Sequence, residues 1–418
     1  MADMASRERE ARRRIGRGYI GSKSKILSVH TVTFQPRGVD RSEDRVVTDL
    51  WDICDQRWLF LAVFDGHLGN ACVDYTSKDL PTAIRRKLRA LVHSIGGRLD
   101  RDNVAEHEAK VTTVLKCEIE KFDRAIGEAV QKMCPRPWEL TEEEAKRLVN
   151  EHEEILDRAF SGTTLALALV NIDQRFMWAA GVGDSSVGLT SIDEHGKPRS
   201  QRLCDLHSFK DPQEHFRATM AHSYAEQPLF DWEDRILGWM NVARAIGDFS
   251  LKLHVSYTAN LFRYLPSAQA YPLSTYIPKI ATPPYIISEP SVRFTDLQPV
   301  WKSGSKIFLF TDGVDNLVDG WLVFRPREHS GADPVDVVSQ LLADEVDPRV
   351  GEVLGHKIIP RWSGREDNRA SDVLGNLLGG QDVERLEMVT DMARLNDKEA
   401  WPFHIDDTSI IVWPLTNA

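Results

Sequence analysis

The stretch Leu59–Asn70 constrains the fold of this chain more than any other. Its first six residues, Leu59–Phe64, are all nonpolar, and they lead directly into Asp65, Gly66 and His67. An apolar run without alternation predicts a strand that is covered on both faces. Asp65 would then lie where the strand leaves the core, and a carboxylate beside an imidazole could hold a cation there. A tight Asp-Gly turn with a surface histidine is the purely structural alternative.

Two further apolar segments also meet carboxylates. The strand expected from Lys306 runs into Asp312, and Asp406 stands just before the last expected strand, 408–413. If these strands lie side by side, their carboxylates gather at one edge of a sheet, where cations must offset the repulsion. Oxygen ligands favour Mg²⁺ or Mn²⁺, and two such ions about 3.5–4 Å apart can clamp a phosphate and activate a water. The residues therefore indicate phosphate-ester hydrolysis.

The composition excludes several other classes of protein. A net charge of −11 over 418 residues argues against general nucleic-acid binding, which needs a concentrated cationic surface. No apolar run is long enough for a membrane helix, and the N-terminus lacks the apolar core of a secretory signal, so we expect a cytoplasmic protein. The five cysteines are scattered, which disfavours a disulfide framework or a cysteine-based zinc site. Glycine-rich phosphate loops, Gly-x-Ser-x-Gly elbows and His-Glu-x-x-His helices are absent.

Local patterns predict one large domain after a short tail. Residues 1–25 carry eight Arg or Lys and are predicted to be a disordered tail, with an organelle presequence as the alternative. The family resemblance given below implies that residues 26–418 form one catalytic domain with a helical insertion at about 80–158 and a loop insertion at about 255–286. The helical stretch has apolar stripes, and Thr141-x-x-Glu144 resembles a capping box. Strands are expected at 25–34, 161–170 and 175–184, and helices at 334–346 and 369–378.

Seven motifs in order resemble the metal-dependent type 2C serine/threonine protein phosphatases. The likeness spans roughly residues 37–414, and within the family the chain is most similar to the pyruvate dehydrogenase phosphatase branch. The motifs are Asp65-Gly66-His67-x-Gly69, Ser161-Gly162-Thr163-Thr164, Gly183-Asp184-Ser185, Ala243-Arg244-Ala245-Ile246-Gly247-Asp248, Glu289-Pro290, Thr311-Asp312-Gly313 and Asp406-Asp407.

The resemblance implies an α+β fold, a four-layer sandwich of two mainly antiparallel β-sheets flanked by helices. It implies hydrolysis of phosphoserine or phosphothreonine in protein substrates, with two Mg²⁺ or Mn²⁺ ions and possibly a weak third. The partner would be a phosphorylated protein, with no nucleic acid and no membrane insertion, and the chain would be a monomer. The relatives in the pyruvate dehydrogenase branch make the mitochondrial matrix the alternative location.

The resemblance also assigns roles to residues. Asp65 would bridge two metals, Gly66 would offer its carbonyl, and His67 would protonate the leaving seryl or threonyl oxygen. The remaining metal positions would be Glu43 on the second ion, Asp44 in its water shell, Asp312 and Asp406 on the first ion, and Asp184 at the third.

Three positions depart from the family pattern. The expected phosphate-binding arginine is replaced by Val39, with Arg37 and Arg41 nearby as substitutes. Ser186 stands where an arginine is usual, and Asn316 replaces an acidic residue, which would weaken a third metal site. These changes favour the rival hypothesis of a pseudophosphatase, a binding protein that has lost turnover. Hydrolysis of small phosphorylated metabolites is a further alternative.

Overall fold

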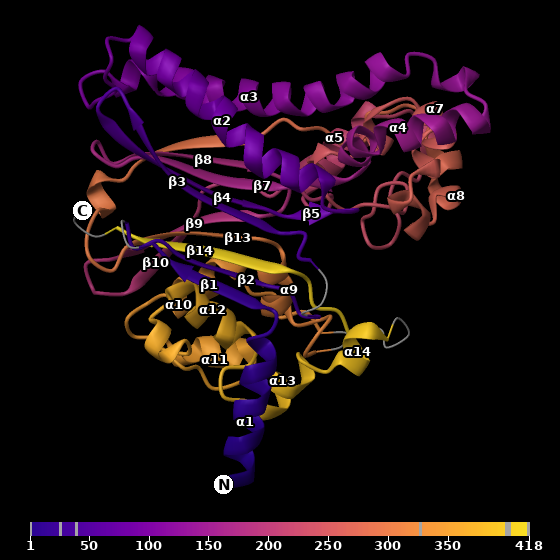
Figure 1. Ribbon diagram of the computed structural model, residues 1–418. Coiled ribbons are helices and arrows are strands. Elements are labelled where there is room, and N and C mark those ends of the chain that lie inside the picture. The colour runs from indigo at the N-terminus through magenta and orange to yellow at the C-terminus, as the bar shows by residue number, and fades with distance from the viewer. Residues whose placement is uncertain (1, 25–26, 38–40, 326–327, 398–402, 416–418) are drawn as a thin grey trace.

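The computed structural model describes residues 2–24, 27–37, 41–325, 328–397 and 403–415, and within them two antiparallel sheets stack face to face (Figure 1). The six-stranded sheet has the order β1 (Tyr19–Lys23), β2 (His30–Phe34), β14 (Thr408–Pro414), β13 (Lys306–Phe310), β9 (Ser186–Ile192) and β10 (Pro198–Arg202). The five-stranded sheet has the order β12 (Ser291–Asp296), β8 (Phe176–Val182), β7 (Leu165–Asn171), β4 (Gln56–Phe64) and β3 (Arg45–Ile53).

Helices cover the outer face of each sheet, so the expected four-layer α+β sandwich is confirmed (Figure 1). The five-stranded sheet is covered by α2 (Ala71–Ser94), α3 (Val104–Met133) and α4 (Glu142–Phe160). The six-stranded sheet is covered by α9 (Gly313–Asp319), α10 (Pro334–Leu341) and α12 (Arg369–Leu377). Helix α11 (Pro348–Leu354) packs against α10, and α13 (Val383–Met388) packs against α1. The predicted capping box at Thr141 is present and begins α4.

The apolar run of β4 is buried on both faces, as its sequence predicts. Phe60, Ala62 and Phe64 point toward the helices, whereas Leu59 and Leu61 pack into the core between the sheets. This alternation follows from the two-residue repeat of a strand. The strand is therefore held rigidly, and the residue at which it ends has a fixed position.

The N-terminal segment corrects the prediction of a disordered tail. Ala2–Ile15 form helix α1, which lies beside α13, and Tyr19–Lys23 form the edge strand β1. Arg7 is paired with Glu387 at 2.7 Å, and Ile15 is 1% exposed. The basic residues of this helix are thus partly neutralised by contacts that are remote in sequence. The division of the rest into one domain with two insertions stays a prediction.

The loop expected at 255–286 contains short helices. These are α7 (Val255–Asn260), η3 (Phe262–Tyr264), η4 (Ser267–Ala270), α8 (Leu273–Tyr276) and η5 (Ile277–Lys279). An additional helix, α5 (Pro212–Ala221), precedes the loop, and a single turn, α6 (Phe249–Lys252), lies after β11 (Ile246–Gly247). The remaining short elements are η1 (Pro137–Glu139), η2 (Tyr224–Glu226), η6 (Gln298–Val300), η7 (Gly364–Glu366) and α14 (Met392–Asn396).

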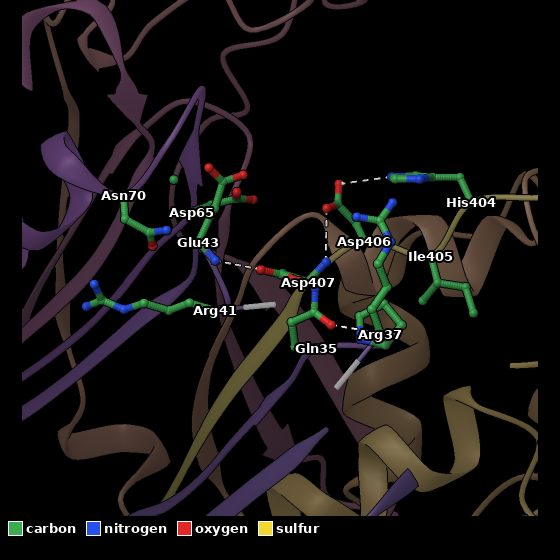
Figure 2. A pocket seen from close by; sticks show the side chains of 12 residues that line it. Gln35, Arg37, Arg41, Glu43, Asp65, Asn70, His404, Ile405, Asp406 and Asp407 are labelled. Atoms are coloured by element: carbon green, nitrogen blue, oxygen red, sulfur yellow. Dashed lines mark hydrogen bonds and ion pairs between the residues drawn. The ribbon is translucent and has the colours of Figure 1, made fainter. Parts of the chain in front are cut away.

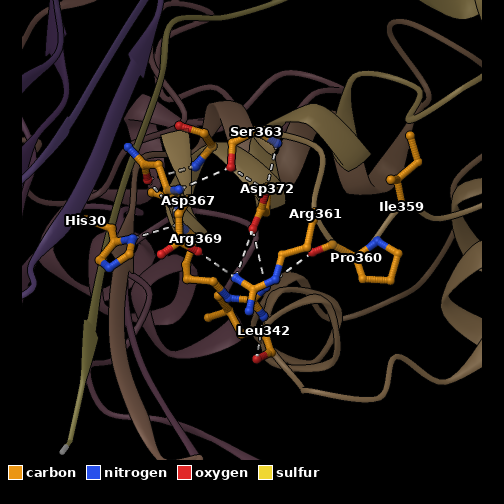
Figure 3. A network of polar contacts seen from close by, with 12 residues as sticks. His30, Leu342, Ile359, Pro360, Arg361, Ser363, Asp367, Arg369 and Asp372 are labelled. Carbon is orange, nitrogen blue, oxygen red and sulfur yellow. Dashed lines mark hydrogen bonds and ion pairs between the residues drawn. The ribbon is translucent and has the colours of Figure 1, made fainter. Parts of the chain in front are cut away.

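A buried polar network ties α12 to the six-stranded sheet (Figure 3). The backbone N–H of Arg369 donates to Nδ1 of His30 on β2 at 2.8 Å, and its guanidinium donates to Asp372 at 3.3 Å and to the carbonyl of Leu342 at 3.0 Å. Because Nδ1 of His30 accepts a hydrogen bond, the imidazole is held neutral, and burial lowers its pKa to about 4.

Candidate active site

The carboxylates identified from the sequence meet where the two sheets end. Asp65 follows β4 of the five-stranded sheet, while Asp312 follows β13 and Asp406 precedes β14 of the six-stranded sheet. The expectation that these strand ends form one edge of a single sheet is therefore wrong. The carboxylates converge between the sheets instead, because the two layers are stacked with these strand ends on the same side of the molecule.

Two adjoining cavities occupy this end of the sandwich. One has a volume of about 310 Å³ and the other about 330 Å³. Both are lined by Glu43, Asp65, Gly66 and Asp406, and Figure 2 shows the first of the two cavities with Glu43, Asp65 and Asp406. The second cavity is also lined by His67, Asp184, Asp312 and, from the loops that follow α5, Arg235, Trp239, Met240 and Tyr271.

Backbone contacts fix Glu43 next to the end of β4. Gly69 donates its N–H to Oε1 of Glu43 at 2.6 Å, and Gly66 donates its N–H to the Glu43 carbonyl at 3.2 Å. The backbone N–H of Glu43 in turn donates to Oδ2 of Asp407 at 2.6 Å (Figure 2). A Cβ on Gly66 would lie 2.6 Å from the Glu43 carbonyl oxygen, so only glycine permits this close approach.

Burial and mutual repulsion raise the pKa of several of these carboxyl groups. Burial is the main cause for Asp65 and Asp312, and neighbouring aspartates add to it: Asp312 acts on Asp65, and Asp406 acts on Asp312. Burial also raises the pKa of Glu43 and Asp184. The ionised cluster is therefore costly by itself, and divalent cations would offset that cost.

Asp44, which follows Glu43 in the sequence, is only 3% exposed. Its Oδ2 accepts a hydrogen bond from Oγ1 of Thr311 at 2.8 Å, whereas Oδ1 is buried without a partner among the described residues. Burial, followed by the nearby Asp407, raises the pKa of this carboxyl group. A buried carboxylate oxygen without a donor fits a cation, or a water bound to one, as its ligand.

The oxygen donors fit hard divalent ions, although the converging side chains do not form a closed set of metal ligands. Among the residues that the structure describes, no group of three or more His, Cys, Asp or Glu side chains is arranged so that it could hold a metal ion as it stands. The fit rests on the chemistry of the set: buried carboxylates with raised pKa values and an unpartnered oxygen on Asp44.

A miniature three-stranded sheet positions His67. Its strands are β5 (Gly66–His67), β6 (Gly162–Thr163) and β11, with Gly162 opposite both His67 and Gly247. Nε2 of His67 lies 2.7 Å from Oδ2 of Asp248, which is fully buried. Burial alone would lower the pKa of the imidazole, but the Asp248 carboxylate raises it above its ordinary value.

Gly162 leaves the space that this contact needs. A Cβ at this position would lie 2.1 Å from Oδ2 of Asp248 and 2.3 Å from Nε2 of His67. Asp248 itself has a left-handed backbone conformation, with φ at 54°, which Asp and Asn tolerate better than most residues. The glycine of the Ser-Gly-Thr motif therefore makes room for the contact between His67 and Asp248, and the aspartate of the Gly-Asp motif suits the left-handed backbone at position 248.

The substitutes for the missing phosphate-binding arginine differ in their contacts. Arg41 is 64% exposed in its side chain and pairs with Asp74 of α2 at 2.8 Å. Arg37 lines the first cavity close to Asp406 and Asp407 (Figure 2). Val39 lies outside the described residues. Both arginines therefore line the first cavity, and the Arg41 guanidinium is also paired with Asp74 of α2.

The structure adds residues that sequence reasoning missed. Arg202 of β10 donates to the hydroxyl of Ser186, so a guanidinium contacts the residue that stands where the family pattern has an arginine. Burial raises the pKa of Asp315 on α9 to about 8, although Arg202 nearby opposes this. His404 lines the first cavity beside Asp406. None of these belongs to a motif: strand pairing brings Arg202 to Ser186, helix placement buries Asp315, and His404 lies two residues before Asp406.

Asp123 of α3 is a further omission, and here the sequence contains a signal. It lies within the apolar stripe that includes Ile119 and Ile126, yet it is charged and 6% exposed. Its carboxylate pairs with Lys252 at 2.8 Å and accepts the N–H of Gly247 at 2.8 Å. A charged residue inside a helix stripe predicts a buried partner.

Comparison with known proteins gives a consistent result. The family model for protein phosphatase 2C matches residues 37–319. Human pyruvate dehydrogenase phosphatase 1 is 29% identical over 162 residues, which is 38% of this chain and 29% of that mitochondrial enzyme. A protein phosphatase 2C homologue from Schizosaccharomyces pombe is 23% identical over 86% of this chain and 78% of its own length.

A solved structure supports the fold. The serine-threonine phosphatase 2C from Toxoplasma gondii superposes with a TM-score of 0.51 at 13% identity, covering 95% of this chain and 99% of its own. The α+β sandwich and the carboxylates between its sheets define a protein-phosphatase fold. The chain belongs to the protein phosphatase 2C family. Among the described residues, no helix is long and apolar enough to cross a membrane.

Proposed function

We propose that this chain hydrolyses phosphoserine and phosphothreonine in protein substrates and that it depends on Mg²⁺ or Mn²⁺. The observation that carries the proposal is the buried group of Asp65, Asp312 and Asp44, whose carboxyl pKa values are all raised. Such a group serves no packing purpose, since it destabilises the metal-free fold at neutral pH. Membership of a protein phosphatase family supports this assignment.

Two ions would be held by the carboxylates that line the two cavities. Asp65 would contact both ions, the Gly66 carbonyl and Glu43 would complete one position, and Asp312 with Asp406 would complete the other. Asp44 would hold a water of the Glu43 site through its unpartnered Oδ1. When bound, the ions would supply charge neutralisation for the phosphate and an activated water.

The side chains around the ions have separate tasks in the proposed reaction. His67 lines the second cavity and would give its proton to the leaving seryl or threonyl oxygen. Arg37 would bind the phosphate at the first cavity, with Arg41 as a weaker candidate because of its contact with Asp74. Asp184 would contribute to a third, weaker position, since Asn316 brings no charge.

The experiment measures phosphate release by the purified chain from phosphoserine peptides, from sugar phosphates and from a small aryl phosphate. We expect turnover of the peptides and the aryl phosphate with added Mn²⁺ or Mg²⁺, and loss of turnover with a chelator. Preference for sugar phosphates would favour the metabolite alternative. Phosphopeptide binding without turnover at any metal concentration would favour the pseudophosphatase alternative, for which the departures at Ser186 and Asn316 argue.

The location and assembly of the protein are proposals of a weaker kind. We propose the cytoplasm as the location, with the mitochondrial matrix as the alternative that similarity to mitochondrial phosphatases supports. Fractionation of cells that express the full chain separates the two. The predicted monomer is tested by the mass of the purified chain in solution.

A further inference from the structure

We propose that Asp248 is the positioning residue for His67, and that a buried ion pair between Asp123 of α3 and Lys252 of α6 holds Asp248 in place. The inference rests on the proposed function, because it assigns work to residues that act on the catalytic acid. It joins the helical layer that the sequence predicts to be an insertion to the chemistry of the site.

The first link is the contact between Asp248 and the imidazole. Oδ2 of Asp248 lies 2.7 Å from Nε2 of His67, and a carboxylate can only accept a hydrogen bond. Nε2 therefore carries a proton, and Nδ1 is the ring nitrogen left for contacts in the cavity that His67 lines. A carboxylate on one ring nitrogen fixes the orientation of the imidazole and with it the direction of the other nitrogen.

The second link is the backbone that carries Asp248. Asp248 and the preceding Gly247 both have positive φ angles, 54° and 90°, so this turn is in a conformation that its surroundings must maintain. The N–H of Asp248 donates to the Ser161 carbonyl at 3.0 Å. A Cβ on Gly247 would lie 2.3 Å from that same carbonyl oxygen, so the turn is packed tightly against β6.

The third link is the ion pair beneath the turn. Both oxygens of Asp123 contact Nζ of Lys252, at 2.8 and 2.9 Å, and both side chains are 8% exposed. Oδ1 of Asp123 also accepts the N–H of Gly247 at 2.8 Å, and Nζ of Lys252 donates to the Ala245 carbonyl at 2.8 Å. The ion pair is thus hydrogen-bonded to the backbone of Ala245 and Gly247, just before Asp248.

The ion pair is hydrogen-bonded to the backbone that leads to Asp248, which indicates a role beyond stabilising the fold. A buried ion pair is weak evidence for stabilisation, because apolar residues of similar volume often pack as well. Here Asp123 accepts a hydrogen bond from Gly247 of β11, and Lys252 donates one to Ala245, the residue before this strand. The ion pair therefore fixes the geometry of this strand relative to α3, and with it the distance from Asp248 to His67.

The variant Asp248→Asn tests the first link, since Asn tolerates the left-handed conformation and has the same shape. A proton donor matters for an alkoxide leaving group and hardly matters for nitrophenolate, which leaves without a proton. We expect kcat to fall about 10- to 100-fold for a phosphoserine peptide and less than about 3-fold for nitrophenyl phosphate. Equal losses on both substrates, or no loss, would overturn the role of Asp248.

Variants of the ion pair test the remaining links. Asp123→Asn leaves Lys252 buried without its counter-charge and is expected to unfold at a lower temperature. The double variant Asp123→Leu/Lys252→Met removes both charges and keeps the fold. It should show the same selective loss on the phosphoserine peptide, by about 3- to 30-fold. Glu128→Gln, an exposed acidic residue of the same helix, is the matched control and should behave as the parent chain.

Two outcomes separate this inference from the proposed function. If the parent chain releases phosphate from the peptide in a metal-dependent manner, but the folded double variant keeps the parent ratio of peptide to nitrophenyl phosphate turnover, the ion pair has no positioning role. If the parent chain releases no phosphate from either substrate, the proposed function has failed, and the role of Asp248 in catalysis fails with it.

Discussion

Thr311 donates its hydroxyl to the carboxylate of Asp44 at 2.8 Å, and this hydrogen bond joins the two sheets at the candidate site. Thr311 follows β13 of the six-stranded sheet, and Asp44 precedes β3 of the five-stranded sheet. The same hydroxyl accepts the N–H of Ser409 at 2.9 Å, so it links a third strand end. The hydroxyl orients Oδ2 of Asp44 and leaves Oδ1 for a further ligand.

Thr311→Val removes this hydroxyl while keeping the volume. It leaves Oδ2 of Asp44 and the N–H of Ser409 without partners, so we expect the free energy of unfolding to fall by about 1–3 kcal/mol. We also expect a higher Mg²⁺ concentration for half-maximal activity. Thr311→Ser keeps the hydroxyl and should remain close to the parent chain. Thermal unfolding and a metal titration check both effects, and equal behaviour of the two variants would contradict the assigned role.

Asp312→Asn should have opposite effects with and without metal. The raised pKa of Asp312 means that its ionised form is costly in the metal-free fold, so the amide should raise the unfolding temperature in chelator by a few degrees. The parent chain should be stabilised by added Mn²⁺, because a ligand that binds only the folded state favours that state. The variant should lose most of this shift. Calorimetry measures the unfolding temperature of both proteins in chelator and its shift when Mn²⁺ is added. A parent chain that Mn²⁺ does not stabilise would count against a metal site.

Gly162→Ala should disrupt the contact between His67 and Asp248. The new Cβ would lie 2.1 Å from Oδ2 of Asp248 and 2.3 Å from Nε2 of His67, so one of these side chains must move. We expect at least about a tenfold loss of phosphopeptide turnover. Gly16→Ala is the control, because its Cβ would meet only ordinary contacts of 3.4 and 3.5 Å. Full activity of Gly162→Ala would show that the contact is dispensable.

His30 should make the fold sensitive to acid. Its pKa is lowered to about 4 by burial, from an ordinary value of 6.5, so the unfolded chain binds more protons than the folded chain between these two values. The stability that its neutral form contributes is complete above about pH 6.5 and is lost as the pH falls toward 4. His30→Asn keeps an acceptor for the N–H of Arg369 and does not titrate.

The measurement for His30 is the free energy of unfolding of both proteins from pH 7.5 to pH 4.5. The variant should lose less stability on acidification, with a difference on the order of 1–3 kcal/mol over the window. Other groups titrate in the same range, and for this reason only the difference between the two proteins is informative. Parallel curves would exclude a buried neutral imidazole at this position.

The sequence predicts the parts of this fold that depend on local patterns. The apolar run of β4 is buried on both faces, and Thr141 begins α4 with its capping box. The sequence also predicts that the carboxylates of Asp65, Asp312 and Asp406 lie close together, because each stands next to one end of an apolar strand. Long-range pairing determines which sheet contains each strand, and local patterns do not show it. For this reason the predicted single sheet edge is wrong, and the three carboxylates lie between two sheets.

Other features depend on contacts that local patterns do not encode. Helix α1 is stabilised by α13, more than 350 residues away along the chain, as the pair of Arg7 and Glu387 shows. Arg202 reaches Ser186 because β10 pairs with β9. Asp123 could have been noticed as a charge within an apolar stripe, but its partner Lys252 follows only from the folded structure.

The central claim is tested most directly by phosphate release from a phosphoserine peptide by the parent chain and by Asp65→Asn, both with Mn²⁺. Asp65 belongs to both cavities, so the amide should reduce turnover at least about 1,000-fold while the far-ultraviolet circular dichroism spectrum stays the same. Asp102→Asn, an exposed aspartate, should retain full turnover. Equal turnover by the parent chain and Asp65→Asn would contradict catalysis at this site.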